Sequence, residues 1–155
     1  MSGTAIRETL GFLAVVASLV FVGVEIRQNT AVARGQTRQD LAALNQEWLV
    51  LMGQDAEWND IYNRAWGDEG ELTELESRRA RFMMLLNLRR MENVYLQYRE
   101  GLVDESALSS YGLQAGGAIY RGARFTEYWQ TGRNGFDPGF VEFFNQRFLE
   151  ENDGP

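Results

Sequence analysis

The side chains in this sequence that could do chemistry are carboxylates, tyrosines, serines, threonines and arginines. The chain of 155 residues contains no Cys and no His, and all 15 of its basic residues are Arg. It therefore has no thiolate nucleophile, no histidine general base and no lysine for Schiff-base or P-loop chemistry. We find no nucleophile–base pair and no metal-ligand pattern among the remaining groups, so we expect no enzyme activity, no cofactor and no metal site.

The polar residues that most suggest a site lie in the middle of one predicted helix. Glu92 follows Arg89 by three residues and precedes Arg99 by seven, so the spacing places all three on one helical face. One interpretation is a site for an anion or for the carboxylate of a partner. The alternative, which we favour, is a structural network of ion pairs along the helix.

Aromatic residues are concentrated in the C-terminal third, where ten of the nineteen lie between Tyr111 and Phe148. They could form the core, a surface for a protein partner or a pocket for an apolar ligand. Aromatic residues at helical spacing most often belong to the core, and the other two alternatives stay open. The candidates for an interface or pocket are Tyr120, Phe125, Tyr128, Trp129 and Phe136.

An uncharged apolar run of fifteen residues extends from Leu10 to Val24. A helix that spans a membrane needs about 20 apolar residues, so this run is short, but the flanking Arg7 and Glu25 could reach the interface by snorkelling. We expect a single-pass membrane anchor over residues 10–24. The alternatives are a helix buried in protein and a signal peptide cleaved after Ala33.

The arginines around this run predict its orientation. Arg7 stands alone before the run, whereas Arg27, Arg34 and Arg38 follow it. Because positive flanks stay on the inner side of the membrane, we expect the C-terminal part in the cytoplasm. The predicted location is therefore the bacterial inner membrane, crossed once.

Hydrophobic spacing and capping residues predict an all-α fold: one long helix, transmembrane in its first half, and a compact bundle of about four further helices. Thr73 and Glu76 match a capping box, and Asp137 and Pro138 match a helix start. We divide the chain into an anchor (1–29), a helical domain (30–149) and a disordered tail (150–155). The predicted helices cover residues 6–52, 55–65, 73–100, 104–116, 124–130 and 137–149.

The net charge of the chain is −7 and its pI is near 4.7. Proteins that bind nucleic acid usually carry a basic face, whereas here the arginines are interleaved with Asp and Glu. We therefore expect no nucleic-acid partner.

Two segments carry a resemblance to a known group. Residues 13–30 read LAVVASLVFVGVEIRQNT, and residues 92–95 with 98–105 read ENVY and YREGLVDE. They resemble a group of uncharacterised proteobacterial proteins, many of them marine, with an apolar N-terminal helix and an Ile-Arg-Gln-Asn-Thr signature. The resemblance implies a membrane-anchored helical protein and implies no activity.

These features together predict a protein that acts by binding other proteins. It would be an accessory or scaffold subunit of a membrane complex, or would assemble with copies of itself. Aromatic residues and Arg are both enriched at protein interfaces, which favours this hypothesis. The alternative is a module that binds a lipid or another apolar small molecule.

Overall fold

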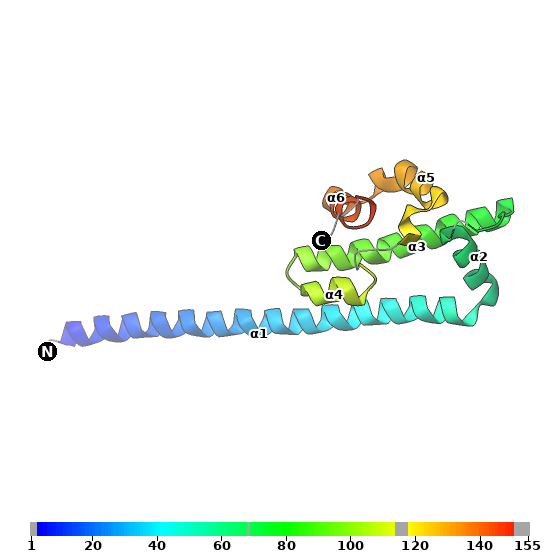
Figure 1. The fold of residues 1–155 in the computed structure, drawn as a ribbon. Coiled ribbons are helices and arrows are strands. Elements are labelled where there is room, and N and C mark those ends of the chain that lie inside the picture. Colours follow the sequence, from blue (N-terminus) through cyan, green and yellow to red (C-terminus); the bar gives the residue numbers. More distant parts are fainter. Residues whose placement is uncertain (1–2, 68, 114–117, 151–155) are drawn as a thin grey trace. The chain divides into compact units, whose positions relative to one another are not determined.

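The structure is a computed structural model that describes residues 3–67, 69–113 and 118–150, and it is all-α, as predicted (Figure 1). No strand occurs in these ranges. The chain divides into two compact units, Met1–Arg38 and Gln39–Pro155, and the predicted anchor (1–29) lies within the first. Of the predicted tail, Glu150 caps the last helical turn, and residues 151–155 lie outside the described part.

Helix α1 spans Gly3–Gln54, within a few residues of the prediction. Among the described residues it is the helix long and apolar enough to cross a membrane, and none of its most apolar stretch is buried in this chain. Leu19 and Phe21, for example, are 67 % and 65 % exposed. The first half of α1 therefore presents apolar side chains that the protein itself does not cover.

Helix α2 spans Ala56–Trp66 and begins where the sequence predicts it. The Asp55 carboxylate accepts a hydrogen bond from the Trp58 N–H at 3.0 Å, which satisfies a free donor of the first turn. Ile61, Ala65 and Trp66 are the buried residues of this helix.

Helix α3 spans Glu74–Arg99 and has the predicted capping box. The Glu76 N–H donates to the Thr73 hydroxyl, and the Thr73 N–H donates to the Glu76 carboxylate. Gly101 follows the helix with a φ of 70°, the left-handed conformation typical of glycine caps. Local capping residues thus define both ends of the longest helix of the second unit.

Helix α4 spans only Glu105–Ser110, shorter than predicted. Gly112 adopts a φ of 88°, and the Leu113 N–H donates back to the Leu108 carbonyl at 2.8 Å. This is the Schellman arrangement that closes a helix. The predicted end near residues 116–117 lies outside the described residues, and Gly112 stops the helix before it.

The C-terminal part is built from short helical pieces in close succession. The Asp137 carboxylate accepts from the Gly139 and Phe140 N–H groups, so Asp137 and Pro138 open α6 as predicted. The elements are η1 (Ala118–Arg121), α5 (Ala123–Gly132), η2 (Arg133–Gly135), α6 (Pro138–Phe144) and the π-helical turn η3 (Asn145–Leu149).

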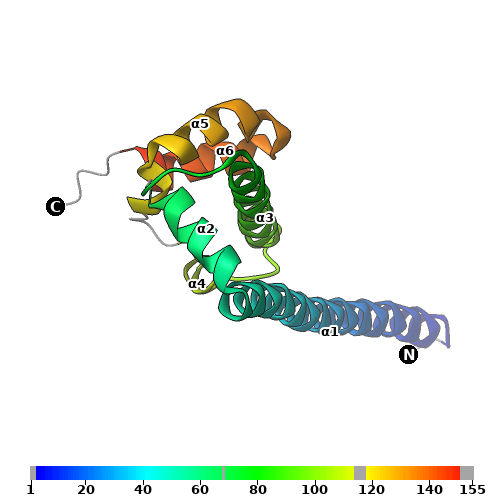
Figure 2. The same ribbon diagram turned by 90° about the vertical axis from the view of Figure 1, so that its right-hand side faces the viewer.

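Within the second unit, α3 is the central element (Figures 1 and 2). The end of α1 and α4 lie on one side of it, and α5 and α6 lie on the other. Met83, Leu88 and Met91 of α3 are fully buried and belong to the hydrophobic core.

Candidate interaction surface

The polar cluster predicted on α3 ties this helix to the segment that opens α6. Arg89 Nη1 lies 2.7 Å from Glu92 Oε2, and Arg89 Nη2 donates to the Gly135 carbonyl at 2.9 Å. The second Glu92 oxygen, Oε1, accepts from the Asp137 N–H at 2.6 Å. Glu92 is only 7 % exposed, so both oxygens of a buried carboxylate are occupied by internal donors.

Arg99, the third member of the predicted cluster, pairs with a different carboxylate. Its Nη1 lies 2.8 Å from Asp137 Oδ1. Burial acts to raise the pKa of Asp137, but hydrogen bonds from Arg99 and from the Phe140 and Gly139 N–H groups outweigh it and lower the pKa. The three predicted residues thus all contact the short segment from Gly135 to Asp137.

Four of the five predicted aromatic candidates are core residues. Tyr120, Phe125, Trp129 and Phe136 are each 7 % exposed or less. The Trp129 ring lies 4.6 Å from that of Phe144, between centroids, and its Nε1 donates to the Asn145 side chain. The fifth candidate, Tyr128, is half-buried and lines a cavity between α3 and α5.

Arg90 connects three segments of the fold by hydrogen bonds, a role that the sequence did not predict. Its guanidinium donates to the Asn45 side chain at 2.6 Å, to the Tyr111 carbonyl at 3.1 Å and to the Asn87 side chain at 2.9 Å. Burial lowers the pKa of Arg90, and no carboxylate of the described chain pairs with it. The residue holds the end of α1, α3 and the segment after α4 together. Its only sequence signal is its place between Leu88 and Met91, two apolar core positions.

The face of α3 opposite the core carries large apolar residues. Leu75, Phe82 and Leu86 are 53 %, 68 % and 49 % exposed. Their spacings of seven and four residues place them on one stripe, on the other side of the helix from buried Met84 and Met91. A helix on a soluble domain usually carries polar residues at such positions.

Beside this stripe lies a groove between the end of α1 and α3, which we call the α1–α3 groove. It has a volume of about 340 Å³, and both of its walls belong to the second unit of the chain. Its apolar walls combine Leu44, which is 43 % exposed, with Leu86. The full lining is Leu44, Glu47, Trp48, Leu51, Leu86, Arg89, Arg90 and Asn93.

Within the described ranges, no three acidic side chains lie close enough together to hold a metal ion. No family model, curated protein or solved structure matches this chain.

Proposed function

We propose that this protein is a single-pass membrane protein, anchored by residues 10–24, whose helical domain binds another protein at the α1–α3 groove. The observation that carries the proposal is the exposed apolar stripe of Leu75, Phe82 and Leu86 beside that groove. Phe82 and Leu86 lie one helical turn apart on this face, and an exposed apolar patch marks interaction sites on soluble domains. The protein would act as an accessory subunit of a membrane complex and would have no catalytic activity.

The geometry of the groove favours a helix as the bound element. Two helices form its walls, and an amphipathic helix buries its apolar face well in such a groove. Glu47 lies on the α1 wall, whereas Arg89 and Arg90 lie on the α3 wall. Opposite charges on the two walls would set the direction in which the partner helix lies. A protein partner is the occupant we favour, and a second copy of this chain is the alternative that the test resolves.

The location that we propose is the bacterial inner membrane, with the helical domain in the cytoplasm. Its support is the excess of Arg27, Arg34 and Arg38 after the apolar run over Arg7 before it. Because the chain has no Cys, single cysteines at Gly3 and Arg133 can report on the two sides. In intact spheroplasts, a membrane-impermeant maleimide should label Gly3→Cys and leave Arg133→Cys unlabelled. The reverse pattern would contradict the proposed orientation.

The proposed function is tested by membrane fractionation with a matched pair of variants. We expect the native protein to resist a carbonate wash and, after mild detergent extraction, to elute in an assembly larger than one chain in its micelle. Leu86→Glu should abolish that assembly, because it places a charge in the groove. Leu49→Glu is the control, since Leu49 is 60 % exposed and lies outside the groove.

Three results would refute the proposal: release by carbonate, elution as a monomer, or equal loss of the assembly in both variants. Two differently tagged copies expressed together distinguish the occupants. Recovery of both tags in one assembly would identify a second copy in the groove, and recovery of another protein alone would identify a partner.

A further inference from the structure

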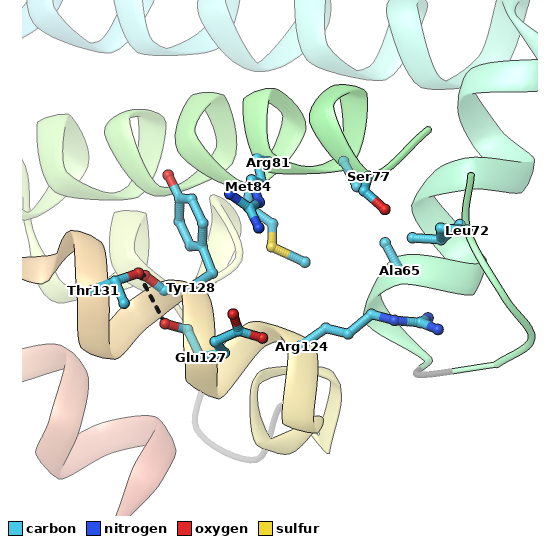
Figure 3. Close-up of a pocket in the computed structure, with 10 residues that line it drawn as sticks. Ala65, Leu72, Ser77, Arg81, Met84, Arg124, Glu127, Tyr128 and Thr131 are labelled. Carbon is cyan, nitrogen blue, oxygen red and sulfur yellow. Dashed lines mark hydrogen bonds between the residues drawn. The ribbon is translucent and has the colours of Figure 1, made fainter. Parts of the chain in front are cut away.

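A second cavity lies between the end of α2, α3 and α5, away from the α1–α3 groove (Figure 3). Its volume is about 480 Å³, within the range of small-molecule sites in proteins. Ala65, Leu72, Ala80 and Met84 give it an apolar floor. Polar side chains surround this floor, which is the pattern expected for a ligand with an apolar body and a polar end.

The charged group that stands out in this cavity is Arg81. Most arginines of the helical domain donate to a carboxylate, a carbonyl or an amide, as Arg64, Arg79 and Arg124 do. Arg81 forms no hydrogen bond or ion pair with any residue that the structure describes. Its five N–H donors are therefore available to a ligand.

Two hydroxyl groups of the lining add further donors. Tyr128 of α5 lies next to Arg81, whereas Ser77, one helical turn before Arg81 on α3, lies toward the opposite end of the cavity (Figure 3). Neither hydroxyl donates to a described residue. Burial raises the pKa of Tyr128, although nearby Arg89 acts to lower it, so the phenol stays protonated and able to donate at neutral pH.

The charge around the cavity also differs from that of the chain. The lining contains two arginines, Arg81 and Arg124, and one carboxylate, that of Glu127, whereas the whole protein has a net charge of −7. Arg124 already donates to the carbonyls of Arg64 and Gly70, so it contributes charge while it closes one side of the cavity. A positive site in an acidic protein selects anions.

We propose that this cavity binds a small water-soluble organic anion with an apolar body. Arg81 holds its carboxylate or phosphate group, the Tyr128 hydroxyl donates to a remaining oxygen, and the apolar body covers Ala80 and Met84. A planar guanidinium group binds both carboxylate and phosphate well. The ligand is therefore expected to be an anion, and the experiment decides which of the two groups it carries. This inference does not depend on the α1–α3 groove.

The test uses the full chain in detergent and four soluble probes of similar size: 3-phenylpropanoate, phenyl phosphate, 3-phenylpropanol and 3-phenylpropylamine. Ligand-observed NMR titration gives a dissociation constant for each probe. We expect at least one anion to bind about tenfold more tightly than the alcohol and the amine. The tighter of the two anions identifies the anionic group.

Variants assign the binding to the cavity. Arg81→Gln should weaken the anion about tenfold, whereas Arg133→Gln, at an exposed position outside the cavity, should leave it unchanged. Ala80→Leu should block the apolar floor and abolish binding of every probe. Leu86→Glu should bind the anion normally, which separates this inference from the proposed function. Equal binding of anion and alcohol, or equal affinities of Arg81→Gln and Arg133→Gln, would overturn the proposal.

Discussion

Replacing Glu92 with Gln tests whether the polar cluster on α3 stabilises the fold. The two carboxylate oxygens accept from different sides, one from Arg89 at 2.7 Å and the other from the Asp137 N–H at 2.6 Å. A glutamine amide has nearly the same shape but only one acceptor oxygen. In either orientation, its NH₂ group must face a guanidinium or a backbone N–H, so one of the two hydrogen bonds is lost.

The expected cost follows from that loss. A hydrogen bond to a charged group contributes about 1.5–3 kcal/mol net. The Arg89 side chain is 48 % exposed, so water can replace its lost acceptor and the lower half of that range applies. We expect Glu92→Gln to lower the free energy of unfolding by about 1.5–2 kcal/mol. Glu92→Ala should lower it by about 2–4 kcal/mol, because the Asp137 N–H then loses its acceptor as well.

The assay is urea unfolding of the full chain in detergent, followed by near-ultraviolet circular dichroism, to which buried Trp129 contributes. Glu100→Gln is the control, because the Glu100 side chain is 66 % exposed and its closest oxygen lies 4.0 Å from Arg99 Nε. Exposed pairs contribute little, so the control should lie within about 0.5 kcal/mol of the native protein. Equal stability of the Glu92→Gln and Glu100→Gln variants would refute the structural role.

Two further predictions use the same assay. Phe144→Ala removes a fully buried ring that contacts Trp129 and should lower the free energy of unfolding by about 3–5 kcal/mol, whereas Phe82→Ala, at a 68 % exposed position, should change it by less than about 1 kcal/mol. The hydrogen bond from Arg64, with those from Thr73, lowers the pKa of Glu76 from 4.5 to about 2. Its contribution to stability is therefore present above pH 4.5 and is lost as the pH falls towards 2. The urea midpoint should fall over this range, and Glu76→Gln should make the fall shallower; an unchanged slope would contradict the assignment.

Helix boundaries were predictable wherever a cap uses residues close in sequence. Asp55, the Thr73–Glu76 pair and the Asp137–Pro138 pair all act within three residues of their partners, and the structure confirms each one. The predicted end of α4 was wrong, although a local signal was present. Gly112 adopts the left-handed conformation that ends a helix, as Gly101 does after α3, and the prediction passed over it.

Contacts between residues far apart in the chain could not be predicted from the sequence. The Arg89–Glu92 pair lies within one helical turn and was predictable. The bond from Asp137 to Glu92 spans 45 residues, and Arg90 reaches Asn45 over the same separation, so both depend on how the helices pack. Apolar residues occur on more than one side of α3, and hydrophobic spacing alone could not show that Phe82 and Leu86 stay uncovered while Leu88 is buried.

The measurement that tests the proposed function most directly is site-specific photo-crosslinking in intact native membranes. A photoreactive residue replaces Leu86 in the α1–α3 groove and, as the control, Leu49 outside it. We predict that position 86 forms a discrete adduct with one protein and that position 49 does not form it. The absence of an adduct at position 86, or the same adducts from both positions, would contradict a docking role for the groove.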